Sequence, residues 1–345
     1  MDLLSTDSWD DSFRDTLSTL RKQRFIPSNN WKVGDYVNVL RYEDSFFIEQ
    51  NLNGLFSAQD LNFFTGDNPL PAMTSMDGHA HKSRKVPMKD FLTQNHVMTD
   101  IVDDFFDRMP DELDIHLDFS LDLCYEIAVQ LMGFPEDDGT MIYEQLQHFV
   151  HNRIQKCMPL FELFKQMYKN PVGLTKVTAE VSNNLEEFVG NMFLMLSGIF
   201  TLSSAIELLF LEASKNDDQL IDADDRFFKE TIRMWSPFSH QLRRSTDRWM
   251  GYPAGTVFAN WFISSNLDPD KFEDPHTFNA QRENLNNHFG FGFGVHRCIG
   301  RQITNVVLSR LVERIKEYKW CALDYNVVYY PIVYVNDLWV QRSKR

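Results

Sequence analysis

The chain has 345 residues, of which 43% are hydrophobic and 14% aromatic, and it carries a formal net charge of −15. This composition predicts a globular protein with a large apolar interior, and the acidic charge argues against a nucleic-acid partner or an anionic membrane surface. The four cysteines, Cys124, Cys157, Cys298 and Cys321, are too widely scattered for a disulfide framework or a zinc site. The first 31 residues are polar, so we expect no signal peptide, no membrane anchor, and a soluble cytoplasmic protein.

The first ninety residues are predicted to mix a short helix with strands, and the following part is predicted to be helical. A short helix is expected over Trp9–Arg24 and a strand over Tyr36–Leu40. From Lys89 to about Asn216 the pattern is almost continuously helical, and its last part, Thr175–Asn216, could form one long helix. Prolines interrupt this pattern at Pro110, Pro135 and Pro171.

The last third mixes helix and strand. A helix is predicted over Asp224–Trp235, a strand-like piece over Thr256–Ile263, another helix after Cys298, and an alternating tail over Val327–Val340. No flexible linker divides the chain, so we expect residues 1–345 to form a single domain, mainly α with a minor β portion.

One run of ten residues, Phe291–Gly300, combines glycines with a cysteine directly before a helix. The helix is predicted from an apolar stripe that recurs every four residues, at Ile299, Ile303, Val307, Leu311 and Ile315. Cys298 therefore lies at a helix N-terminus, where backbone N–H groups and the helix dipole favour a thiolate. Gly292, Gly294 and Gly300 leave space for something flat and bulky to approach the backbone. With His296 and Arg297 beside it, such a thiolate is suited to bind haem iron.

This run resembles the haem-binding signature of the cytochrome P450 family, phenylalanine-glycine-x-glycine-x-histidine-x-cysteine-x-glycine, without a gap. Two other interpretations are a glycine-rich loop with an ordinary buried cysteine, and a dinucleotide-binding loop, which the glycine spacing does not support. The resemblance implies the family's fold, with a long central helix over the haem and the cysteine loop before a C-terminal helix. It also implies haem b held by Cys298, with Phe291, Gly292, Gly294 and Gly300 around it.

Three further residues resemble the family's structural triad. Glu230 and Arg233 lie three apart on one helix face, like the family's Glu-x-x-Arg element, and Arg282 stands in a loop before the haem signature. The resemblance implies a role in folding and in assembly of the haem pocket rather than in chemistry.

Four positions resemble the family's propionate-binding groups. His81 and Lys85 lie four apart on a predicted helix, with lysine in place of the usual arginine. Arg243 occupies the strand position that grips the other propionate, although its neighbour Arg244 remains an alternative. His296 is the fourth candidate. An exposed basic helix start is the ordinary alternative for the first two.

The central helix departs from the family pattern. Members that activate oxygen usually carry an acid–alcohol pair there, whereas this chain has Ser197-Gly198-Ile199-Phe200-Thr201. The resemblance assigns Gly198 to the space above the iron and Thr201 to proton relay, with Phe200 in the place of the acid. Because splitting the O–O bond requires protons, the loss of that carboxylate removes one donor path. Ser197, Glu207 or ordered water are alternative sources.

Three functions remain open. The first is a monooxygenase that hydroxylates a small hydrophobic or aromatic molecule with O₂ and electrons from a separate ferredoxin- or flavodoxin-type donor. The second is haem-thiolate chemistry of another kind, either oxidative aromatic coupling or a donor-independent peroxygenase, isomerase or dehydratase. The third is a non-catalytic docking module, against which Cys298 and the propionate cations count.

The chain is short for the family, and the deficit is expected between Gln147 and Asn183, where longer members have mobile lid helices. The candidate lid residues in this segment are Phe161, Phe164, Met167 and Tyr168. The alternative is that they form an ordinary core face of a helix. His148 and His151 lie three apart but have no further metal ligand nearby in the sequence.

Overall fold

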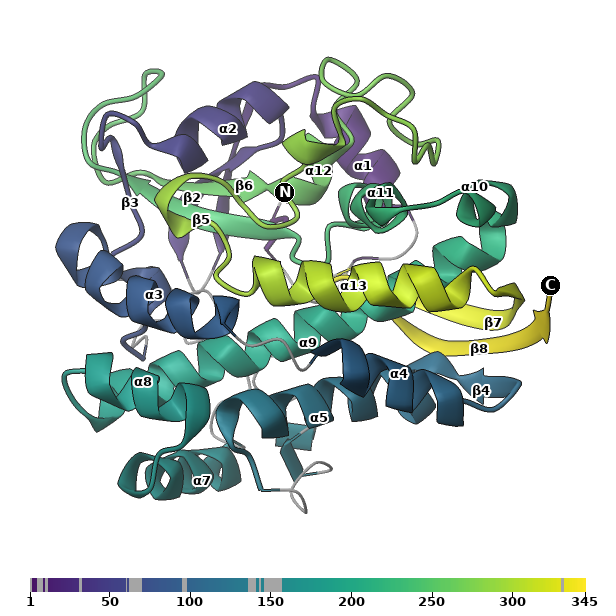
Figure 1. Cartoon of the computed structure of the whole chain (residues 1–345). Helices are drawn as coiled ribbons and strands as arrows, with labels where there is room; N and C mark the ends of the chain where they lie inside the picture. Colours follow the sequence, from purple (N-terminus) through teal and green to yellow (C-terminus); the bar gives the residue numbers. More distant parts are fainter. Residues whose placement is uncertain are drawn as a thin grey trace.

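The computed structural model describes residues 2–4, 9, 12–30, 33–59, 61, 70–94, 98–135, 141–142, 144–145, 157–329 and 332–345. Several long helices lie on one side of the molecule and the larger sheet lies with shorter helices on the other, and the long helix α9 (Leu185–Lys215) runs between the two sides (Figure 1). The predicted class, mainly α with minor β, is confirmed. The expected histidine pair His148 and His151 lies outside the described residues.

Helix α9 has 31 residues, about 46 Å at 1.5 Å per residue. Its start is defined by Asn184, whose side chain accepts a hydrogen bond from the backbone N–H of Glu187 at 2.9 Å. The single helix expected over Thr175–Asn216 is therefore wrong in one respect: it is divided into α8 (Gly173–Val181) and α9. Ser182 between them is extended, at φ −83° and ψ 136°.

By length and composition α9 could cross a membrane, but 72% of its most apolar window is buried inside the protein. Its hydrophobic surface is covered by neighbouring helices and by β8 (Tyr334–Lys344). The helix is apolar all round because it is the core of the fold.

The other helices of this side are α3 (Gly78–Thr93), α4 (Met98–Arg108), α5 (Leu121–Met132) and α7 (Met158–Lys169). Each proline break expected from the sequence falls between elements. Pro110 precedes β4 (Glu112–Asp114) and a π-helical turn η2 (His116–Ser120), Pro135 follows the left-handed Gly133 that ends α5, and Pro171 separates α7 from α8.

The candidate lid residues on α7 belong to the core. Phe161 and Phe164 both lie 5.0 Å, centroid to centroid, from Phe193 of α9, and Tyr168 lies 5.0 Å from Phe188. Met167 is also buried. The alternative of a plain core face is confirmed for these residues.

The larger sheet has the strand order β1-β2-β6-β5-β3. Its strands are β1 (Phe25–Asn30), β2 (Gly34–Val39), β3 (Phe56–Ser57), β5 (His240–Ser245) and β6 (Val257–Trp261). Only β2 and β6 pair in parallel, and the other pairs are antiparallel. The predicted strands near Tyr36 and Thr256 correspond to β2 and β6, which meet here although they are far apart in the sequence.

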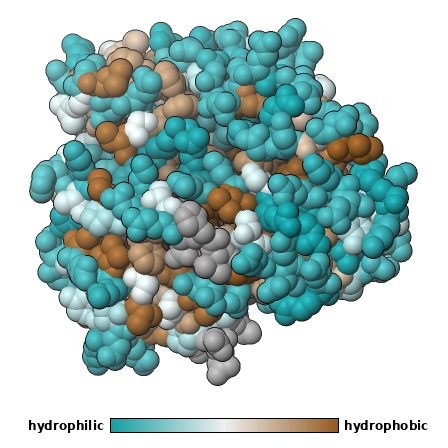
Figure 2. Space-filling model, in the orientation of Figure 1, coloured by the Kyte–Doolittle hydropathy of each residue, from teal (hydrophilic) through white to brown (hydrophobic). Residues whose placement is uncertain are grey.

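The smaller sheet has the order β4-β8-β7, with β7 (Tyr318–Val328) and β8 forming a long antiparallel hairpin. The alternating tail expected over Val327–Val340 covers the end of β7 and the first part of β8. The remaining short elements are α1 (Phe13–Leu20), α2 (Tyr42–Gln50), η1 (Met73–Ser75), α10 (Asp217–Ile221), α11 (Asp225–Trp235), α12 (Phe262–Asn266), η4 (Leu285–Asn287), η5 (Gly294–His296) and α13 (Arg301–Ile315). The molecular surface in Figure 2 is mostly hydrophilic with scattered apolar groups, which agrees with the many charged residues of the chain.

The Glu230–Arg233–Arg282 triad forms as the resemblance implies. Arg233 donates to both carboxylate oxygens of Glu230, at 2.6 and 2.7 Å, and both side chains are fully buried. Arg282 adds a third hydrogen bond to the same carboxylate at 3.0 Å. Arg233 also donates to the carbonyl oxygens of Asn266 and Pro275. The triad thus ties α11 to the loops that precede the cysteine run.

Candidate haem-thiolate site

The cysteine loop folds back on itself before α13. The backbone N–H of Cys298 donates to the carbonyl oxygen of Phe291 at 2.9 Å, which closes the loop. The stripe predicted for the following helix is confirmed, with Ile303, Val307, Leu311 and Ile315 buried and Ile299 half-buried. Packing of this stripe places Cys298 at the helix N-terminus and against a pocket.

Opposing influences act on the thiol of Cys298. Burial raises its pKa, while hydrogen bonds from the backbone N–H groups of Gly300 and Arg301 and the charge of Lys85 act to lower it. The pKa is raised overall, and the backbone N–H groups and Lys85 supply the influences towards a thiolate that the sequence predicts. A bound metal cation deprotonates a coordinating thiol outright.

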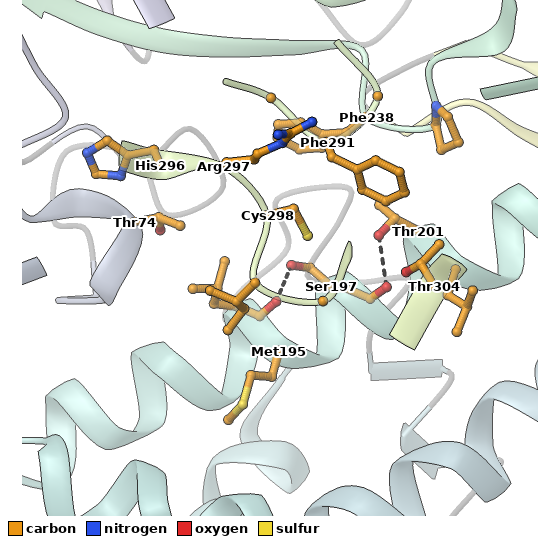
Figure 3. Close-up of a pocket in the computed structure, with 18 of the residues that line it drawn as sticks. Thr74, Met195, Ser197, Thr201, Phe238, Phe291, His296, Arg297, Cys298 and Thr304 are labelled. Atoms are coloured by element: carbon orange, nitrogen blue, oxygen red, sulfur yellow. Dashed lines mark hydrogen bonds between the residues drawn. The ribbon is translucent and has the colours of Figure 1, made fainter. Parts of the chain in front are cut away.

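Across the pocket from Cys298 stands the middle of α9 (Figure 3). Gly198 is exposed there, and a Cβ added to it would meet no atom within 4 Å. One turn on, the hydroxyl of Thr201 donates to the carbonyl oxygen of Gly198 at 2.8 Å, and the hydroxyl of Ser197 donates to that of Leu194 at 2.7 Å. Both hydroxyl groups donate to carbonyl oxygens of their own helix, and both residues line the pocket.

Phe200 lies elsewhere. It is 2% exposed, does not line the pocket, and packs against Tyr334 of β8 with the ring centroids 5.7 Å apart. The placement of Phe200 at the reaction centre, expected from its position between Gly198 and Thr201, therefore differs from the structure. One residue along an α-helix turns the side chain by about 100°, which directs it into the core instead.

The glycines of the loop divide into two kinds. Gly292 and Gly300 line the pocket, as expected. Gly294 does not line the pocket. A Cβ at this position would collide with the backbone oxygen of Glu49 at the end of α2, so the glycine allows α2 to approach the loop closely. With φ +65° this position also favours glycine for conformational reasons. Gly294 thus permits contact with α2 rather than with a flat ligand.

The four groups expected at the propionates gather at one edge of the pocket, which is lined by His81, Lys85, Arg243 and His296. Of the two neighbouring arginines, Arg243 is 4% exposed and faces the pocket. Arg244 is exposed on the sheet and donates to the carbonyl oxygen of Gly255 at 3.2 Å.

Arg243 has an internal partner that the sequence does not reveal. Its Nη2 donates to Oε2 of Glu49 at 2.7 Å, and Asn260 of β6 donates to Oε1 of the same carboxylate at 2.8 Å. Glu49 is 3% exposed, and burial raises its pKa against the influence of Arg243. Its place in α2, a short helix without strong amphipathic patterning, carries no signal for such a role.

The two histidines contact each other. The ring centroids of His81 and His296 are 4.2 Å apart, and His296 lies 3.4 Å from a carboxylate oxygen of Asp77. Burial lowers the pKa of His81 to about 4 and that of His296 to about 3. Both rings are therefore neutral at pH 7 and can offer one N–H each.

Lys85 reaches from α3 to the cysteine loop. Its ammonium group donates to the carbonyl oxygens of Val295 and of Arg297, the latter at 2.6 Å. Burial lowers the pKa of Lys85 to about 8 despite the nearby Cys298. This lysine therefore fastens the loop as well as adding positive charge.

The pocket between these walls contains about 1600 Å³ free of protein atoms, part of it open to solvent. It has a soft ligand atom on one side, an open glycine on the other and cations at one edge. Haem has the matching parts: a central iron, a flat ring and two carboxylates. The residues present therefore fit the group. Among the described residues, no three His, Cys, Asp or Glu side chains gather in another metal-binding cluster.

Comparison with known proteins agrees with this geometry. Residues 224–320 match the family model for cytochrome P450. This segment is similar to the cytochrome P450 family. The segment contains the triad, the cysteine loop and α13, which are the parts that the sequence motifs predicted.

The chain is similar to several bacterial proteins. It is 29% identical over 195 residues to a steroid C26-monooxygenase of Mycolicibacterium smegmatis, covering 49% of this chain and 48% of that one. It is 25% identical over 334 residues to cytochrome P450 109 of Bacillus spizizenii, covering 81% and 78%. It spans about half the length of the steroid enzyme and of the linalool 8-monooxygenase of Pseudomonas putida that it matches.

Solved structures show the same fold over the whole chain. Cytochrome P450-153 from Novosphingobium aromaticivorans superposes with a TM-score of 0.83 at 21% identity, covering 99% of both chains. The predicted P450 fold, with its long central helix and its cysteine loop before a C-terminal helix, is confirmed. The likeness to this family implies haem with a cysteine thiolate ligand as the cofactor.

Proposed function

We propose that the chain is a cytochrome P450 monooxygenase that hydroxylates a small hydrophobic or aromatic molecule. The observation that carries the proposal is the thiol of Cys298 facing the open Gly198 of α9 across one pocket. The relatives named as monooxygenases of a steroid and of linalool support hydrophobic substrates.

Haem bound here would supply the oxygen chemistry, with Cys298 as the ligand that donates electron density to the iron. Gly198 leaves the space in which a small molecule can lie against the ring. Met73, Phe238 and Ile332 line the same pocket and exclude water around an apolar substrate. Thr201 Oγ1 donates to Gly198, so it can accept a hydrogen bond from water and hold a proton donor close to that space.

Electrons are proposed to come from a separate ferredoxin- or flavodoxin-type protein, and the place of action is proposed to be the cytoplasm. The cationic side chains of Arg297 and Arg301 stand around the cysteine loop, where such a donor would approach the thiolate ligand. Their charge would favour an acidic donor.

The first experiment is the spectrum of the purified protein reconstituted with haem, oxidised and then reduced under carbon monoxide. The wild-type protein is expected to give the carbon monoxide band of a thiolate-ligated haem. Cys298→Ser should lose that band, whereas Cys321→Ser, at an exposed cysteine on β7, should keep it. A band that survives in Cys298→Ser would show that another residue is the ligand.

A second candidate is haem-thiolate chemistry without an electron donor, or oxidative coupling of aromatic molecules. It is favoured by one observation: among the described residues that line the pocket, Glu49 is the only carboxylate, and it is bonded to Arg243. Turnover with hydrogen peroxide alone, at a rate no lower than with O₂ and a reduced ferredoxin, would favour this candidate. Product containing an oxygen atom from ¹⁸O₂ would favour the monooxygenase.

A further inference from the structure

We propose that Glu49 is a positioning residue for Arg243, and that its charge sets how tightly this pocket holds the carboxylates of its cofactor. The inference rests on the proposed haem site. Its basis is an acidic side chain that is buried beside the cation expected to bind a propionate.

Glu49 helps to fix the direction of the Arg243 guanidinium. One nitrogen of this group, Nη1, donates to the carbonyl oxygen of Leu242 in the same strand at 2.8 Å. The other end is held by Glu49, which accepts from Nη2 at 2.7 Å. A guanidinium has five N–H donors, so Arg243 has further N–H groups with which it can bind a carboxylate in the pocket that it lines.

Glu49 is itself fixed from two sides. Asn260 of β6 donates to the carboxylate of Glu49. The backbone oxygen of Glu49 occupies the space that a Cβ atom at Gly294 would need. The residue therefore touches both the sheet that carries Arg243 and the loop that carries Cys298. A change at Glu49 reaches the propionate cation directly, while the loop contact depends only on backbone atoms and on Gly294.

The electrostatic consequence follows from burial. Glu49 is 3% exposed and Arg243 4% exposed, so water screens their interaction poorly. In the protein without cofactor, Glu49 neutralises Arg243. When a propionate binds, two carboxylates share one guanidinium and repel each other. The charge of Glu49 thus stabilises the empty pocket relative to the filled one.

The repulsion predicts opposite effects on haem binding for substitutions of Glu49 and of Arg243. Glu49→Gln keeps the shape of the side chain and removes the repulsion. Its new amide can also be accommodated, because Oδ1 of Asn260 has no hydrogen-bond partner among the described residues. Arg243→Gln leaves a buried carboxylate facing the propionate with no cation between them. Adding Glu49→Gln to Arg243→Gln should therefore restore binding, which a purely structural role would not do.

The test is the rate at which ferric holoprotein transfers haem to excess apomyoglobin, for the wild type, both single variants and the double variant. Relative to wild type, Glu49→Gln should release haem about fivefold more slowly, a typical size for coupling between two sites. Arg243→Gln should release it at least about tenfold faster, and the double variant should recover most of that loss. Glu43→Gln, at an exposed acid on the same helix, is the matched control and should not change the rate.

A second readout is the reduction potential of the haem, which should be higher in Glu49→Gln because a negative charge near the ferric iron is gone. If Glu49→Gln does not fold, comparison of Arg243→Gln with the double variant still tests the repulsion. Release from Glu49→Gln at or above the wild-type rate, or a double variant no better than Arg243→Gln, contradicts the proposal. A wild-type protein that binds no haem contradicts the haem site as well, which distinguishes the two failures.

Discussion

Phe200 packs against Tyr334, with ring centroids 5.7 Å apart and planes at 65°, while its neighbour Thr201 lines the pocket. The position that the resemblance assigns to the family's acid therefore belongs to the hydrophobic core here. Replacing it with a carboxylate would bury a charge without an ion-pair partner rather than supply protons to the pocket.

We therefore expect Phe200→Asp to lower stability without improving product yield. Phe200→Ala should lower the free energy of unfolding by about 3–5 kcal/mol through loss of a buried ring, and Phe200→Leu by less. Urea denaturation of the three variants measures the loss, and product formed per electron pair measures coupling. A Phe200→Asp variant that is as stable as wild type and better coupled would contradict the packing described here.

Thr201→Ala should impair turnover while leaving stability nearly unchanged. The side chain is only half-buried and donates to the carbonyl oxygen of Gly198 in its own helix, and its hydroxyl can hold water beside that glycine. The rate of product formation is expected to fall by about a hundredfold, as for loss of a proton-transfer group. Oxygen consumption and product should be measured together, with Thr201→Ser as the control that keeps the hydroxyl. An unchanged product rate would favour the donor-independent or coupling chemistry.

Two glycine-to-alanine changes should separate packing from pocket space. Gly198→Ala meets no atom within 4 Å and lies within a helix, so it should raise the free energy of unfolding by about 0.5–1 kcal/mol. The Cβ of Gly294→Ala would collide with the backbone of Glu49, and the φ of +65° at position 294 is strained for alanine. This change should lower the free energy of unfolding by more than about 1–2 kcal/mol.

Thermal unfolding measures both effects, and ligand-induced spectral shifts of the haem report on the pocket. Only Gly198→Ala should weaken ligand binding in a protein of normal stability. Equal stability losses at the two positions would show that Gly198 packs against something other than the pocket.

His116 and Glu207 form a buried pair that should make stability depend on pH. His116 Nδ1 lies 2.8 Å from Glu207 Oε1, and Ser120, Ser203 and the backbone N–H of Val335 donate to the same carboxylate. Burial acts to lower the pKa of His116, but the hydrogen bond and charge of Glu207 outweigh it, so the pKa is above its ordinary value of 6.5.

Because the folded-state pKa is raised, the stabilisation is fully present below the unfolded value near 6.5 and is lost as the pH rises through the folded-state pKa. Removing the ring with His116→Ala should cost about 3–5 kcal/mol at pH 6, and the difference from wild type should shrink towards pH 9. Urea denaturation from pH 6 to pH 9 measures this difference in the free energy of unfolding. His79→Ala, at an exposed histidine, is the control. A difference that is constant with pH would show that the ring is neutral in the folded protein.

The local motifs were predictable from the sequence because each depends on residues close together in the chain. The glycine and cysteine spacing of Phe291–Gly300, the apolar stripe that follows it, and the Glu230–Arg233 pair on one helix turn are all local patterns. The resemblance to the family added Arg282, which the structure places on the same carboxylate.

The tertiary structure decided what no local pattern contains. Only the meeting of α2 with β5 reveals that Glu49 is the partner of Arg243, because these residues are 194 positions apart. Packing against β8 directs Phe200 into the core although the sequence places it between two pocket residues. Contact between Gly294 and α2, rather than a ligand, explains that glycine. Sequence determines which residues share a helix face or a turn, whereas burial and long-range partners depend on which elements the fold brings together.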